Sequence, residues 1–74
     1  MVKFNTYVGV FSGNKMKFVT AVHRHDAEWE SGKPALKLSE DFAKDIVLGL
    51  TLNGYPSAVV RVLNGVELSN PEEE

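Results

Sequence analysis

The side chains that could hold a metal ion gather in one short stretch, residues 23–30. In an extended strand His23 and His25 point to the same side, about 7 Å apart, and Asp26 could add an oxygen ligand from the following loop. Two histidines and a carboxylate suit Fe(II), Mn(II) or Zn(II). The alternative is two solvent-exposed histidines beside carboxylates. The stretch lacks the His-Glu-x-x-His pattern and the chain has no third histidine, so we predict no bound metal. His23, His25 and Asp26 are the weak candidates for metal ligands.

Other patterns that carry catalysis or cofactor binding are absent from the sequence. There is no cysteine, no Gly-x-Ser-x-Gly, and no spacing that pairs one serine with a histidine and a carboxylate. The glycine spacings of phosphate-binding and dinucleotide-binding loops are missing as well. We therefore assign no catalytic residue and no cofactor, and the sequence favours a non-enzymatic protein.

Binding of single-stranded nucleic acid is a second alternative. Tyr7, Phe11 and Phe18 would project from one face of a sheet, as in platforms on which bases stack. Lys15 and Lys17 fall on the opposite face, however, and the formal charge of the chain is −2. Since phosphate contacts supply most of such affinity, this charge balance disfavours nucleic acid as a partner.

The length of 74 residues allows one domain with one small core. We predict an α+β domain over residues 1–68 and an acidic, flexible tail over residues 69–74. The chain has no cysteine, and its start lacks the apolar region of a signal peptide, which predicts a cytoplasmic protein. Its longest apolar stretch, residues 46–52, is too short to span a bilayer, so no membrane partner is expected. Small, acidic, cysteine-free chains of this kind are frequent among bacterial and phage accessory proteins.

Residues 2–11 and 15–25 are predicted to form a β-hairpin, because both runs are rich in Val, Phe, Tyr and Thr. The Gly13-Asn14 pair at the centre of a two-residue loop supplies the positive φ that a primed turn needs. That turn sets a register in which Ser12 faces Lys15, Phe11 faces Met16, Gly9 faces Phe18 and Tyr7 faces Thr20.

Residues 39–53 are predicted to form the one helix. Ser39 is a suitable N-cap, and Asn53 is followed by Gly54 and Pro56, which stop a helix. Gly49 costs about 1 kcal/mol relative to alanine in a helix interior, and close packing against the sheet would explain it. Two leucines fall outside the apolar stripe of this helix, on its opposite flank: Leu48 and Leu52.

Residues 57–63 are predicted to form a third strand, and the Asn64-Gly65 turn could return the chain as a short fourth strand over 66–68. The element order ββαβ(β) then gives a small, mainly antiparallel sheet of order 2-1-3, covered on one face by the single helix. The sequence leaves open which face of the sheet packs on the helix.

The run from Ser39 to Val60, a helix followed by Gly-Tyr-Pro-Ser-Ala-Val-Val, resembles helix–strand units of many small α+β domains, SPOR-type peptidoglycan-binding domains among them. The resemblance covers less than a third of the chain, and a hairpin stands where those domains have their first helix. It therefore implies no function for this chain.

Both faces of the predicted sheet carry apolar side chains, although an antiparallel sheet with one solvated face normally has a polar face. One helix covers only one of them, and large exposed apolar patches usually mark binding sites. The edge of the second strand also lacks proline, so another strand could pair with it. We therefore predict a protein–protein interaction module, a homodimer or the binder of another protein. The alternative is a helix arc or a strand register shifted by one residue, which would place the same side chains in the core. The predicted contact residues are Tyr7, Phe11, Met16, Phe18, Leu48 and Leu52.

Overall fold

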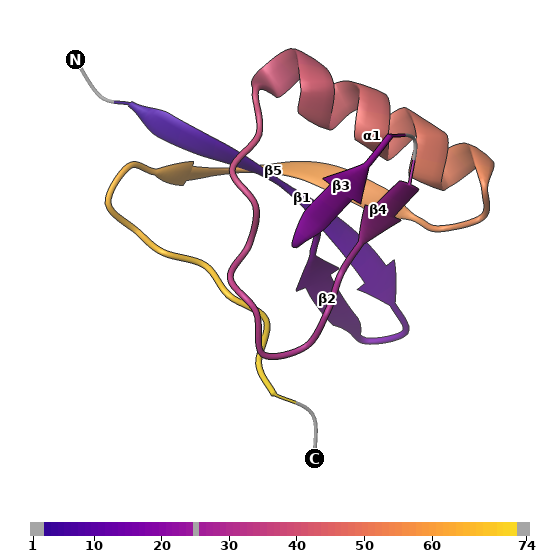
Figure 1. The fold of residues 1–74 in the computed structure, drawn as a ribbon, viewed down its shortest axis with the longest axis horizontal. Helices are drawn as coiled ribbons and strands as arrows, with labels where there is room; N and C mark the ends of the chain where they lie inside the picture. Colours follow the sequence, from indigo (N-terminus) through magenta and orange to yellow (C-terminus); the bar gives the residue numbers. More distant parts are fainter. Residues whose placement is uncertain (1–2, 25, 73–74) are drawn as a thin grey trace.

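The computed structural model describes residues 3–24 and 26–72. These residues form an α+β fold, as the sequence predicts (Figure 1). The elements follow in the order β1 (Phe4–Ser12), β2 (Lys15–Phe18), β3 (Ala21–His23), β4 (Asp26–Glu28), α1 (Glu40–Leu52) and β5 (Ser57–Leu63).

The main sheet is antiparallel and has the order β2-β1-β5, which confirms the predicted order. The turn between β1 and β2 contains Gly13 at a φ of 61°, a left-handed conformation that glycine adopts without strain. The predicted hairpin register is confirmed where the two strands pair, and the bounds of β5 match the predicted third strand. The confirmed partners are Gly9 with Phe18, Phe11 with Met16, and Ser12 with Lys15.

The prediction of one long second strand over 15–25 is wrong, because β2 ends at Phe18. The expected pair of Tyr7 with Thr20 is consequently absent from the register. Beside the first half of β1 lies a later segment, since the backbone N–H of Leu38 donates to the carbonyl of Thr6 at 2.9 Å. This segment takes the place that a longer β2 would occupy.

The residues after β2 form a second, separate sheet of β3 and β4. Its closing pair is His23 with Asp26, and Arg24 in the turn has a φ of 56°. The predicted fourth strand over 66–68 is not formed. The chain instead pairs there with the connection before α1, where the N–H of Ala35 donates to the carbonyl of Leu68 at 2.9 Å.

The helix forms where the capping residues predict it. The hydroxyl of Ser39 accepts the N–H of Phe42 at 3.3 Å, and the N–H of Asn53 closes the last turn on the carbonyls of Gly49 and Leu50. Acidic residues fill the first turn, where the helix dipole favours negative charge. One of them, Glu40, forms an ion pair with Arg61 of β5 and so ties the start of α1 to the sheet.

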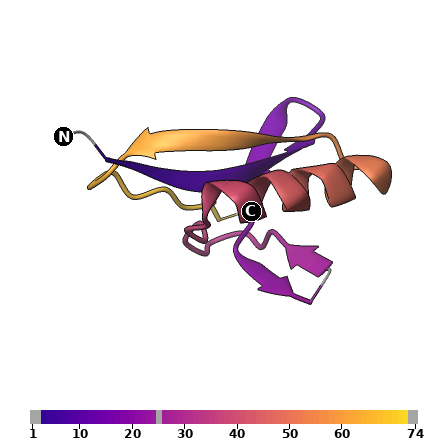
Figure 2. The same cartoon turned by 90° about the horizontal axis from the view of Figure 1, so that it is seen from above.

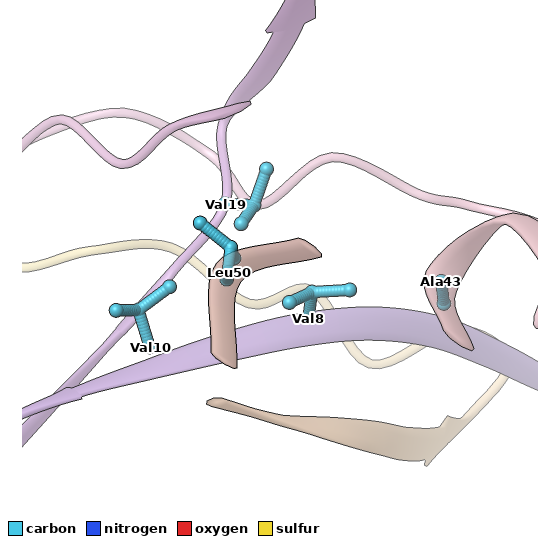
Figure 3. Close-up of a cluster of buried hydrophobic side chains, with 5 residues drawn as sticks. All are labelled: Val8, Val10, Val19, Ala43 and Leu50. Atoms are coloured by element: carbon cyan, nitrogen blue, oxygen red, sulfur yellow. The ribbon is translucent and has the colours of Figure 1, made fainter. Parts of the chain in front are cut away.

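The buried core joins the sheet to the helix (Figure 3). Figure 2 shows α1 running along one side of β1 and β5, with β3 and β4 on that same side. The cluster contains Val8 and Val10 of β1, Val19 after β2, and Ala43 and Leu50 of α1. The sheet face that carries Val8 and Val10 is therefore the one turned toward the helix, which settles a point that the sequence leaves open.

Within the described ranges, the only helix is 13 residues long, and neither its length nor its composition would let it cross a membrane.

Candidate functional site

The face of the main sheet turned away from α1 is lined by apolar side chains from all three strands. Side chains alternate between the two faces along a strand, and directly paired residues share a face. Because Val8 and Val10 point toward α1, their neighbours in β1 and the partners of those neighbours point the other way. We call this surface the apolar sheet face; its residues are Tyr7, Phe11, Met16, Phe18, Ala58, Val60 and Val62.

Much of the apolar sheet face remains accessible to solvent. Phe11 is 45% exposed, Met16 is also exposed, and Val60 is only half-buried. Gly9 leaves the space that Met16 fills, since a Cβ built on Gly9 would lie 2.5 Å from the Met16 sulfur. The glycine thus leaves room for the Met16 side chain on the apolar sheet face.

Tyr7 is predicted as a contact residue, but the structure buries it. Its exposed fraction is 1%, and its ring meets that of Phe18 edge to face, with centroids 6.2 Å apart and planes at 64°. Tyr7 therefore contacts the ring of Phe18 and has almost no solvent-exposed surface that a partner could contact.

Leu48 and Leu52 of α1 are 60% and 78% exposed. They lie on the helix, whereas the apolar sheet face lies on the far side of the sheet. The structure thus divides the predicted contact residues between two separate surfaces.

The outer edge of β2 is closed at Phe18 by the side chain of Asn70. The amide oxygen of Asn70 accepts the N–H of Phe18 at 2.7 Å, and its nitrogen donates to the carbonyls of Phe18 at 2.9 Å and Glu30 at 2.8 Å. Asn70 is only 3% exposed, so it is a packed residue within the segment for which the sequence predicts a flexible tail. These bonds occupy the backbone groups that an added strand would need at this point of β2.

The candidate metal ligands are only partly brought together. His23 and Asp26 pair across β3 and β4, and the Nε2 of His23 lies 3.8 Å from a carboxylate oxygen of Glu28. His25 lies outside the described residues. Among residues 3–24 and 26–72 no group of three or more His, Asp or Glu side chains is arranged to hold a metal ion.

A groove of about 730 Å³ separates the β3–β4 hairpin from α1. Trp29 and Tyr55 lie in its wall with ring centroids 5.2 Å apart and planes at 67°. The sequence does not predict this groove, because residues 15–25 have the pattern of one long strand. The one sequence feature that points to the groove is Gly49, an unfavourable residue in a helix interior, which lines the groove from the helix side.

Comparison with protein-family models, with curated proteins and with solved structures found no match for this chain.

Proposed function

We propose that this protein is a non-enzymatic interaction module that forms a homodimer through its apolar sheet face. The observation that supports the proposal is the apolar composition of a face that no described helix covers. Exposed apolar patches on monomers are rarely large, and contiguous ones usually mark sites where another protein binds.

We choose a second copy as the partner because an apolar patch can pack against the same patch of another copy. Two-fold dimers bring the same patch of both copies together, so an apolar patch needs no matching charge on its partner. Two sheets packed face to face lie about 10 Å apart and interdigitate their side chains. Phe11 and Met16 project from such a surface and would contact the other copy, while Tyr7 keeps the ring of Phe18 in place.

Sedimentation equilibrium over a wide concentration range tests the proposal. The unmodified chain is expected to dimerise, and Phe11→Asp is expected to be monomeric because it would bury an unpaired charge in the interface. Leu52→Asp is the control, since it adds the same charge to an exposed apolar position on α1, away from the apolar sheet face. It should leave the dimer intact.

Three outcomes would contradict the proposal. The first is a monomer at high micromolar concentration. The second is a dimer that Phe11→Asp leaves unchanged. The third is a dimer that Leu52→Asp alone dissociates, which would move the interface to the leucine flank of the helix. Far-ultraviolet circular dichroism of each variant would show that the fold is retained.

A further inference from the structure

We propose that the groove between the β3–β4 hairpin and α1 binds a small organic cation that carries a quaternary ammonium group. Its volume of about 730 Å³ lies within the range of small-molecule sites in proteins. The inference concerns the opposite side of the molecule from the apolar sheet face, and it does not rest on the proposed dimer.

Three aromatic rings line the groove. Trp29 reaches it from the residue after β4, Tyr55 from the turn after α1, and Phe42 from the first turn of the helix. The rings of Trp29 and Tyr55 meet edge to face, as two adjoining walls of an aromatic cage do. A cation over an aromatic face is attracted by the electrons of the ring, and quaternary ammonium groups are recognised in this way.

The charges of the groove complement a cation. Asp45 lines it from α1 and Asp26 from β4, and Arg24 of the hairpin turn is the one basic side chain among the lining residues described. Two carboxylates against one guanidinium leave the wall with a formal charge of −1. Arg24 and Asp26 both belong to the hairpin wall of the groove. Asp45 is the one charged residue among the described lining residues of the helix wall.

Gly49 supplies a third observation. A glycine within a helix is less favourable than alanine, and tight packing is the usual structural reason for it. The expected close contact with the sheet is absent, because a Cβ built on Gly49 would meet no atom within 4 Å. The glycine instead lines the groove, where it lets a bound group approach the helix backbone.

Titration with choline tests the proposal directly. Trp29 is the only tryptophan of the chain, so its fluorescence reports on the groove wall. The matched control ligand is 3,3-dimethylbutan-1-ol, which has the shape of choline without its charge. We expect a saturable change with choline and at least tenfold weaker binding of the neutral alcohol.

Variants locate the binding. Tyr55→Ala should weaken choline binding about 2- to 30-fold, the range expected for one cation–π contact. Asp45→Asn keeps the shape of the side chain and should also weaken binding, and Gly49→Ala should do so by narrowing the groove. Leu63→Ala, at an exposed position outside the groove, is the control and should bind choline as the unmodified chain does.

The proposal is overturned if choline gives no saturable change, if the neutral alcohol binds equally well, or if acetate binds more tightly than choline. Binding that survives both Tyr55→Ala and Asp45→Asn would also overturn it, because the cation would then lie elsewhere. Chemical-shift changes measured by NMR provide the same test without relying on tryptophan fluorescence.

Discussion

Replacing Asn70 with alanine is expected to destabilise the fold strongly for a residue so near the end of the chain. The Asn70 side chain is buried and forms three hydrogen bonds with the backbone of Phe18 and Glu30, at distances of 2.7 to 2.9 Å. Phe18 stands 52 positions earlier in the sequence. The asparagine thus joins the end of the chain to the edge of β2.

The magnitude follows from the number of bonds. A hydrogen bond contributes about 1 kcal/mol net, so the loss of all three in Asn70→Ala should cost about 3 kcal/mol. That is a large fraction of the roughly 5–15 kcal/mol that stabilises a small domain. Asn70→Asp keeps the acceptor for the N–H of Phe18 but removes both donated bonds and sets a carboxylate against two carbonyl oxygens. It should cost about as much as the alanine variant, although it preserves the shape of the side chain.

Urea denaturation followed by Trp29 fluorescence measures these differences. Asn5→Ala is the control, because the Asn5 side chain forms one exposed hydrogen bond among the described residues, to the side chain of Asn64 at 3.2 Å. Its expected cost is within about 0.5 kcal/mol. If Asn70→Ala costs no more than Asn5→Ala, the C-terminal segment does not depend on Asn70 for its place beside β2, and the reasoning is refuted.

Three further predictions concern the helix and one surface ion pair. Leu50→Ala should cost about 2–5 kcal/mol in urea denaturation because Leu50 belongs to the buried cluster, while Leu52→Ala should stay within about 0.5 kcal/mol. Gly49→Ala should stabilise the fold by about 1 kcal/mol, since the added methyl group meets no neighbour; a loss of stability would contradict the open space found there. Lys33 donates to Glu30 at 2.9 Å, which lowers the pKa of the Glu30 carboxyl below its ordinary value and raises the pKa of Lys33. The pKa of Glu30 is lower in the folded chain than in the unfolded chain. The ion pair therefore stabilises the fold at pH values above the pKa of the unfolded chain, and this contribution disappears as the pH falls through the pKa of the folded chain. Acid titration of the unfolding free energy should show that loss in the unmodified chain and not in Glu30→Gln.

The elements predicted correctly are those whose signals lie within a few neighbouring residues. Gly13 and Asn14 define a tight turn, and the turn by itself sets the register between β1 and β2. Ser39 and Asn53 mark the two ends of α1 through bonds to residues three or four positions away. Such local chemistry is encoded in a short window of sequence, so it can be recognised without knowledge of the rest of the chain.

The elements predicted wrongly depend on contacts between distant parts of the chain. Residues 19–25 have the composition of a strand, but Leu38 takes the position beside Thr6 that a longer β2 would need. The anchoring of Asn70 against Phe18 spans most of the sequence and has no local signature. The groove also has no local signature, because its walls come from the β3–β4 hairpin and from α1, which are separated in the sequence.

The two proposed surfaces lie on opposite sides of the main sheet, and this arrangement has a thermodynamic consequence. A dimer formed through the apolar sheet face leaves the groove open in both copies. The groove is lined by residues of the β3–β4 hairpin and α1, and these elements lie together on one side of β1 and β5 (Figure 2). A ligand with equal affinity for monomer and dimer does not shift the equilibrium between them. A dimer formed through Leu48 and Leu52 would instead involve the same helix that forms one wall of the groove. Choline binding would then change the affinity of dimerisation, and by linkage dimerisation would change the affinity for choline by the same factor. Independence of the two equilibria therefore favours the sheet face as the dimer interface, and mutual dependence favours the helix.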